Sequence, residues 1–174
     1  HLPGRPRMMT KMPVRLTTLS LMGLQAKSVL WDIGACTGSI SVEARLKYPH
    51  LQVTAFEKRI QSEPVIRRNA GKHGAPGINL LMGDYLEIDK GHMEPPDAVF
   101  LGGYGGAMEQ VLNDVHHHLT GGGVVAFNAV SKASRDRFLK WCHHSGYRVC
   151  TPVRLAVDDH NPIEILTAVK GLHV

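Results

Sequence analysis

The sequence contains no long apolar run and few cysteines. Nowhere does it reach the roughly 18–20 consecutive apolar residues of a membrane-spanning helix, and no apolar core follows the basic N-terminus as it would in a signal peptide. Its three cysteines are odd in number and form no Cys-x-x-Cys pair, which argues against a disulfide framework and against a zinc site. These absences predict a protein of the reducing cytoplasm with no membrane partner.

Acidic residues are outnumbered by basic ones, and the net charge is +5. A basic balance attracts polyanions, either nucleic acid or a small molecule rich in carboxylates. The 174 residues suffice for one domain with a substantial core. We expect an irregular arm over residues 1–12 and a single domain over residues 13–174. Because residue 1 is His, we expect a trimmed or processed chain, or the C-terminal part of a longer fused enzyme.

The most informative segment runs from Val29 to Gly38. It combines an apolar strand, an acidic residue and a tight glycine turn before a helix, a layout that holds a nucleotide-like cofactor. The dinucleotide pattern G-x-G-x-x-G fits poorly, because Cys36 and Ser39 stand where glycine or alanine is needed. The pattern D-x-G-x-G-x-G is typical of S-adenosylmethionine-dependent methyltransferases. It fits from Asp32 to Gly38 with only the middle glycine replaced, by Cys36.

Two carboxylates follow the next two expected strands. Glu57 ends a strand about 20 positions after the glycine loop, where a carboxylate can accept both ribose hydroxyls. Asp84, followed by Tyr85, ends the third strand, where it can accept the exocyclic amine of adenine. The alternatives are a solvated strand-end carboxylate for Glu57 and a turn or helix cap for Asp84. Their register with the loop favours the cofactor for both.

Strand and helix signals alternate along the chain. The pattern predicts an α/β fold with a doubly wound, mostly parallel seven-stranded sheet and helices on both faces, the Rossmann-like class I methyltransferase arrangement. The last strand is expected to be antiparallel, after a hairpin turn at 158–162. Strands are expected near 28–33, 52–56, 78–82, 98–101, 123–127, 147–155 and 163–169, and helices near 13–24, 39–48, 61–73, 107–118 and 132–145.

A second glycine-rich segment follows the fourth expected strand. Gly102, Gly103 and Tyr104 begin a loop at the carboxyl end of the sheet, where ligands of open α/β sheets bind. Four glycines around one aromatic residue favour a backbone wall against a large flat substrate over a flexible turn. We predict that Tyr104 and Asn128 line the substrate pocket.

Candidates for binding substrate carboxylates lie before the first helix and in its first turn. Thr10, Lys11 and Arg15 offer a hydroxyl and two cations beside the expected sheet tip, although a helix cap with solvated charges is the alternative. The consecutive histidines at 116–118 do not share a helix face, so no metal site is expected there. The Pro-Pro pair at 95–96 precedes its strand, unlike the Asp-Pro-Pro-Tyr motif of nucleobase methyltransferases, which weakens a nucleic-acid substrate.

Three segments together resemble a known family: residues 9–15, residues 31–39 and residues 96–103. They look like the decarboxylating precorrin-6Y 5,15-methyltransferases, and more narrowly like their carbon-15 methylating and decarboxylating unit from cobalamin biosynthesis. The resemblance extends from about residue 8 to about residue 170. Family members usually carry glycine where this chain has Cys36. The resemblance implies S-adenosyl-L-methionine contacts from Thr10, Gly34, Ala35, Cys36, Thr37, Gly38, Glu57, Asp84 and Tyr85.

The resemblance also implies a substrate and partners. The substrate is a precorrin, a reduced tetrapyrrole with many carboxylates, methylated on carbon 15 and decarboxylated on the acetate of carbon 12. A carbon-5 methyltransferase is expected as a partner or fused domain, and a homo-oligomer, a tetramer, is expected. No catalytic acid or base is assigned, because the conjugated carbon is itself the nucleophile. The residues predicted to bind substrate are Lys11, Arg15, Gly102, Gly103, Tyr104 and Asn128.

Two alternatives stay open. One is a class I methyltransferase that acts on another substrate, such as RNA. The other is a non-catalytic domain that kept the fold and lost the cofactor, with Cys36 as the suspected cause.

Overall fold

A computed structural model describes residues 10–157 and 162–172 of the chain. None of the helices in these ranges is long and apolar enough to span a bilayer. The helices are α1 (Met12–Leu21), α2 (Ser39–Lys47), α3 (Glu63–Lys72), α4 (Met108–His118) and α5 (Lys132–His144), with short 3-10 helices η1 (Leu24–Ala26) and η2 (Ile60–Ser62). The strands are β1 (Val29–Ile33), β2 (Gln52–Glu57), β3 (Ile78–Met82), β4 (Ala98–Leu101), β5 (Val124–Ala129), β6 (Arg148–Val149), β7 (Val153–Leu155) and β8 (Ile163–Val169).

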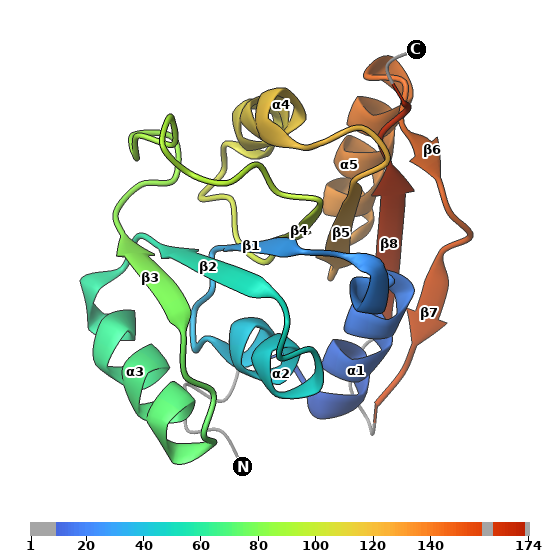
Figure 1. The fold of residues 1–174 in the computed structure, drawn as a ribbon. Coiled ribbons are helices and arrows are strands. Elements are labelled where there is room, and N and C mark those ends of the chain that lie inside the picture. The colour runs from blue at the N-terminus through green and yellow to red at the C-terminus, as the bar shows by residue number, and fades with distance from the viewer. Residues whose placement is uncertain (1–9, 158–161, 173–174) are drawn as a thin grey trace.

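The strands form one twisted sheet, seen in Figure 1. Their order is β3-β2-β1-β4-β5-β8-β6, and β7 also pairs with β8. Strands β1 to β5 are parallel, whereas β8 runs antiparallel to β5, β6 and β7. The predicted doubly wound, mostly parallel sheet with an antiparallel last strand is confirmed.

Helices cover both faces of this sheet (Figure 1). On one face, Leu19 of α1 and Ile40 of α2 pack against the even-numbered side chains of β1, such as Leu30. On the other face, α4 and α5 pack against the odd-numbered side chains, such as Trp31. All five residues of β1 are buried, because a central parallel strand is covered on both faces. The apolar run at 29–33 is therefore explained by the strand's central position.

The segment expected as one strand over 147–155 forms the two short strands β6 and β7. Residues 150–152 separate them, and Pro152 has no backbone N–H to donate to a ladder. The sheet therefore has eight strands where seven were expected, over the part of the chain that the structure describes. Most of the expected turn at 158–162 lies outside that part, as do residues 1–9 of the expected arm.

The first helix is shorter than expected. It begins at Met12 and ends at Leu21, with a proline in its first turn. Gly23 has a φ of 63°, a left-handed conformation that ends the helical path and begins η1. The chain then enters β1 without a further helical turn.

The loops after β1 and β4 meet at the point where the strand order reverses. The carbonyl of Ile33 accepts the N–H groups of Gly102, at 2.8 Å, and of Gly103, at 3.1 Å. Gly34 lies against the same backbone: a Cβ at this position would lie 2.5 Å from the nitrogen of Gly103. Such a crevice is where ligands of doubly wound folds bind. Its geometry depends on glycine at position 34.

We expect Gly34→Ala to lower the free energy of unfolding more than Gly23→Ala does. Both residues have a positive φ, 74° and 63°, so both substitutions add left-handed strain. Only at Gly34 would the new Cβ meet backbone, whereas nothing lies within 4 Å of the position at Gly23. Overpacking of this kind costs a further ~1–3 kcal/mol. Urea denaturation of both variants measures the difference, and equal losses would contradict the close packing of the two loops.

Candidate functional site

A cavity of about 1070 Å³ opens along the carboxyl ends of the parallel strands. Its walls come from the ends of β1, β2 and β5, the loops after β3 and β4, the start of α1 and the β7–β8 region. Single-ligand pockets usually enclose about 300–1,000 Å³. The cavity is therefore large enough for a cofactor and a substrate side by side. We call the part around Glu57 and Asp84 the acidic end, and the part around Lys11, Tyr104 and Asn128 the basic end.

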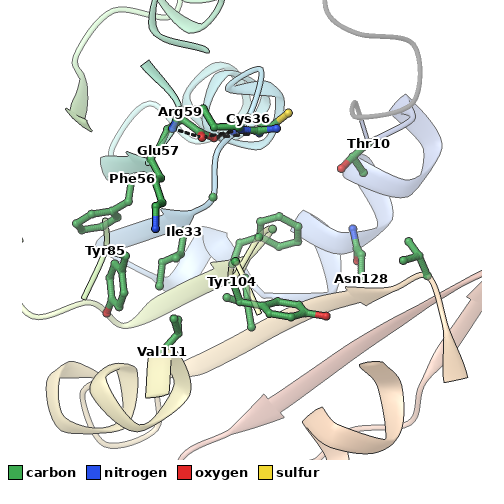
Figure 2. Close-up of a pocket in the computed structure, with 18 of the residues that line it drawn as sticks. Thr10, Ile33, Cys36, Phe56, Glu57, Arg59, Tyr85, Tyr104, Val111 and Asn128 are labelled. Atoms are coloured by element: carbon green, nitrogen blue, oxygen red, sulfur yellow. Dashed lines mark hydrogen bonds and ion pairs between the residues drawn. The ribbon is translucent and has the colours of Figure 1, made fainter. Parts of the chain in front are cut away.

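Glu57 lies at the carboxyl end of β2 and is only 3% exposed. One carboxylate oxygen accepts the backbone N–H of Cys36 at 2.6 Å. The other accepts from the backbone and the side chain of Arg59, at 2.8 and 3.1 Å. The Glu57 carboxylate also raises the pKa of the Arg59 guanidinium through that hydrogen bond. Glu57 thus ties the glycine loop to the end of β2, as Figure 2 shows.

Asp84 begins the turn after β3 and lines the same end of the cavity. Its carboxylate accepts from the Lys58 ammonium at 2.6 Å and from the backbone of Leu86 at 3.2 Å. The hydrogen bond from Lys58 is the main reason that the pKa of Asp84 is lowered. Because this pair is largely exposed, it orients the carboxylate more than it stabilises the fold.

Tyr85 follows Asp84 and turns its ring into the protein. The ring lies edge-on to Phe56, with the centroids 5.0 Å apart, and the side chain is 6% exposed. Burial, and then the nearby Asp114 carboxylate, raise the pKa of the Tyr85 phenol. Phe56 and Tyr85 form an apolar, aromatic floor beside Glu57 (Figure 2).

The glycine loop presents only part of its length to the cavity. Gly34 and Cys36 belong to the lining. Ala35 packs behind them against Ile66 of α3, and the carbonyl of Thr37 accepts from the buried amide of Asn69 at 2.9 Å. Gly38 also faces α3, since a Cβ there would lie 2.9 Å from the Ile66 side chain. Ala35, Thr37 and Gly38, which were predicted to contact the cofactor, shape the loop from behind.

Cys36 has a φ of 58°, the sole positive φ among the non-glycine residues that the structure describes. A left-handed conformation costs an L-residue about 1–2 kcal/mol relative to the right-handed region. The hydrogen bond from its N–H to Glu57 holds the residue in that conformation. The middle position of the D-x-G-x-G-x-G pattern therefore calls for glycine on conformational grounds, and Cys36 is strained there.

Asp32 lies inside the sheet immediately before the loop and is 1% exposed. One of its oxygens accepts the backbone N–H of Ser41 at 3.1 Å and the hydroxyl of Ser41 at 2.5 Å. The other oxygen is buried without a hydrogen-bond partner. Burial raises the pKa of Asp32 to about 6, although the bonds from Ser41 oppose the shift. The carboxylate joins β1 to the first turn of α2.

The basic end brings together most of the residues predicted to bind substrate. Lys11, Tyr104 and Asn128 line it together with Thr10, which was predicted to contact the cofactor, and Figure 2 shows Thr10 and Asn128 on the side of α1. The Thr18 hydroxyl lies 3.0 Å from the Asn128 amide oxygen and holds that side chain. Gly102 and Gly103 line the cavity between the two ends.

Arg15 does not belong to the lining. Its side chain is 6% exposed, and its guanidinium donates to the carbonyl of Thr10 at 2.7 Å and to Glu43 of α2 at 3.2 Å. It therefore fixes the backbone at the entrance of α1 and joins that helix to α2. The predicted contact between Arg15 and substrate has no support in this geometry.

Several lining residues were not singled out from the sequence. Lys58 and Arg59 directly follow Glu57, so their place in the cavity lining could have been predicted from that motif. The apolar wall of the basic end could not be predicted from the sequence, because it is assembled from segments far apart in the chain. Its described members include Val14, Val130, Leu155 and Ile163.

Charge divides the cavity. Among the described lining residues the carboxylates are Glu57 and Asp84, both at the acidic end and both paired with a neighbouring cation. At the basic end the lining contributes Lys11 and, in the described ranges, no carboxylate. The described residues also contain no group of three His, Cys, Asp or Glu side chains that could hold a metal ion. The arrangement offers oriented carboxylate acceptors at one end and, at the other, the ammonium of Lys11, which also donates to the carbonyl of Val157 at 3.3 Å.

Comparison with known proteins gives a consistent result. Residues 5–172 match the family described as precorrin methyltransferase domain. The chain is 32% identical over 155 residues to a cobalt-precorrin-6B C(15)-methyltransferase (decarboxylating) from Salmonella typhimurium, which covers 89% of this chain and 79% of the relative. It is 36% identical over 122 residues to a precorrin-6Y C(5,15)-methyltransferase [decarboxylating] from Sinorhizobium, but spans only 29% of that longer protein.

Solved structures agree with these relatives. A precorrin-6Y C5,15-methyltransferase from Geobacter metallireducens GS-15 superposes with a TM-score of 0.90 at 32% identity, covering 98% of this chain and 95% of the other. An O-methyltransferase from Streptomyces achromogenes, solved in complex with S-adenosylmethionine, superposes with a TM-score of 0.80 at 17% identity, covering 95% and 83%. At that identity the second likeness shows the fold alone.

The pKa of Asp32 predicts a pH-dependent stability. Because the folded value of about 6 lies above the ordinary 3.8, the folded protein holds this proton more tightly, and its stabilising contribution falls as pH rises between those values. The fall is up to about 3 kcal/mol, at 1.36 kcal/mol per pKa unit. The free energy of unfolding of Asp32→Asn should lack this dependence on pH. Urea titrations from pH 4 to pH 7 measure the wild-type minus variant difference, which would stay flat if Asp32 ionised normally.

Replacing the strained residue of the loop should stabilise the protein. Cys36→Gly is expected to raise the free energy of unfolding by about 0.5–1 kcal/mol, since relief of left-handed strain outweighs the added freedom of the unfolded chain. Cys36→Ala, which removes the thiol and keeps the strain, is the matched control and should gain nothing. Thermal unfolding of both variants makes the comparison. A gain in the alanine variant equal to that in the glycine variant would assign the effect to the thiol.

Proposed function

The chain belongs to the family of precorrin methyltransferase domains, and we propose from this that it methylates carbon 15 of cobalt-precorrin-6B or its metal-free counterpart and decarboxylates the acetate on carbon 12. S-adenosyl-L-methionine is the methyl donor in this proposal. The observation that carries it is one cavity along the carboxyl ends of the parallel strands, lined at one end by Glu57 and Asp84 and at the other by Lys11, Tyr104 and Asn128.

The acidic end has the chemistry of a site for S-adenosyl-L-methionine. The Glu57 carboxylate can accept from ribose hydroxyls, and Asp84 lies where it can accept from an adenine amine. Phe56 and Tyr85 offer apolar ring surface to the base. Gly34 and Cys36 of the glycine loop line this end, so a ligand can approach the backbone of the loop. When bound there, the cofactor supplies an electrophilic methyl group on its sulfonium.

The basic end suits a flat polyanion. Lys11 can pair with a carboxylate, and Asn128 and Thr10 offer polar contacts. The ring of Tyr104, supported edge-on by Phe127 at a centroid distance of 6.1 Å, presents a flat apolar surface. The side chains of Val14, Val130, Leu155 and Ile163 complete an apolar wall. A reduced tetrapyrrole with carboxylate arms matches this combination of a flat surface and peripheral charge.

The residues of the chain act mainly by alignment. Gly102 and Gly103 separate the two ends, so a substrate lying on Tyr104 meets the cofactor across these glycines. Holding the nucleophilic carbon near the methyl group supplies most of the rate enhancement in such a reaction. An apolar wall around the reacting arm excludes water from the decarboxylation. No side chain is assigned as an acid or base.

Partners follow from the relatives. Because the Sinorhizobium relative is much longer than the matched region, a carbon-5 methyltransferase, fused or separate, is proposed as the partner of this unit. A homotetramer is proposed as the assembly.

The experiment is an incubation of the protein with cobalt-precorrin-6B and S-adenosyl-L-methionine, read by mass spectrometry. The expected product has gained one methyl group and lost carbon dioxide. Calorimetric titration with the cofactor alone is the companion measurement, with binding expected. No heat and no thermal shift at millimolar cofactor would identify a non-catalytic domain. Cofactor binding without tetrapyrrole turnover, joined to salt-sensitive RNA binding, would favour a nucleic-acid substrate.

A further inference from the structure

Arg137 of α5 lies beside the substrate surface without belonging to the motifs considered above. Its guanidinium donates to the Tyr104 hydroxyl at 3.4 Å and lies 5.7 Å from the centre of the Tyr104 ring. An arginine within about 6 Å of an aromatic face makes a favourable cation–π contact. Tyr104 itself lines the cavity. Two segments far apart in the chain, the loop after β4 and α5, therefore place a cation at the rim of the basic end.

Within the described part of the protein, the Arg137 guanidinium contacts an aromatic ring and its hydroxyl rather than a carboxylate. No carboxylate of these residues forms an ion pair with it. Arg135, two residues earlier on the same helix, differs: it binds Glu164 at 2.6 Å and Asp136 at 3.0 Å. Arg135 thus has a structural role between α5 and β8, whereas the guanidinium of Arg137 has spare donors at the mouth of a cavity.

Resting on the proposed function, we infer that Arg137 is a substrate-binding residue whose guanidinium, oriented by Tyr104, pairs with a carboxylate of the tetrapyrrole that lies on the Tyr104 ring. An arginine fork can bind a carboxylate with two parallel hydrogen bonds while its plane still contacts the aromatic ring. Lys11 stands at the α1 side of the same end, so the two cations can hold separate arms of one macrocycle.

The carboxylate that pairs with Arg137 is one that the product retains. In decarboxylation the bond between the carboxyl carbon and the methylene carbon breaks, carbon dioxide leaves, and the electron pair passes into the conjugated ring before a proton is taken up. Pairing the leaving carboxylate with a cation stabilises the ground state more than the transition state, in which that charge has moved away. Arg137 therefore fixes the orientation of the macrocycle, and the leaving arm lies elsewhere, against the apolar wall.

The test compares Arg137→Gln, Tyr104→Phe and the control Lys140→Gln, which removes the same charge from a neighbouring exposed position on α5. Equilibrium dialysis of cobalt-precorrin-6B without cofactor should show a Kd raised roughly fivefold in Arg137→Gln, the scale of a partly exposed ion pair. Its dependence on salt should be weaker than in the wild type. Arg137→Lys should restore part of the affinity, and Tyr104→Phe should lie between wild type and Arg137→Gln. Lys140→Gln should match the wild type.

Two further readouts separate substrate binding from a structural role. Affinity for S-adenosyl-L-methionine and the melting temperature should be unchanged in Arg137→Gln, and the fraction of methylated product that is also decarboxylated should equal that of the wild type. An unchanged tetrapyrrole Kd, or equal losses for cofactor and tetrapyrrole with a lower melting temperature, would overturn the inference. A higher decarboxylated fraction would place the leaving carboxylate on Arg137 and overturn it too. If the wild-type protein binds the tetrapyrrole but does not turn it over, only the proposed reaction is contradicted. The inference about Arg137 is still tested in that case, because the comparison of Kd values does not depend on turnover.

Discussion

The contact between the loops after β1 and β4 is the constraint on which the site depends. One carbonyl, that of Ile33, accepts two successive N–H groups of the β4 loop, and Gly34 packs against that backbone with no room for a side chain. This contact fixes where the glycine loop ends and where the loop that carries Tyr104 begins. The cavity, its two ends and the passage between them take their shape from it. A doubly wound sheet creates the crevice, and the glycines set its width.

The charged side chains that line the two ends of the cavity differ. At the acidic end each carboxylate has a local cation, so the site offers oriented oxygen acceptors with little net charge. At the basic end the lining contributes the ammonium of Lys11, which donates to the carbonyl of Val157 at 3.3 Å. The acidic end thus offers oriented carboxylate acceptors, and the basic end adds a cation beside the Tyr104 ring.

Features that depend on neighbouring residues in the chain were predictable from the sequence. The alternating pattern gave the order of elements, and the spacing from Asp32 to Glu57 predicted that Glu57 lies in register with the glycine loop, where its carboxylate accepts the backbone N–H of Cys36. Features that depend on tertiary contacts were not. The burial of Arg15 against Glu43 required knowing that α1 packs on α2, and the contact of Arg137 with Tyr104 joins segments 33 residues apart. The split of one expected strand into β6 and β7 reflects a single proline whose effect on pairing could have been weighed.

The place of β8 has a consequence for how the chain is made. This strand comes last among the described strands, yet it lies inside the sheet, between β5 and β6, and pairs with β7 as well. A ribosome synthesising the chain releases every other strand before it. Until β8 emerges, β5 carries an open edge of backbone donors and acceptors, which is the kind of surface that pairs wrongly with other chains. The sheet can close only after β8 has been synthesised, so the nascent chain passes through a stage in which β5 has an unpaired edge.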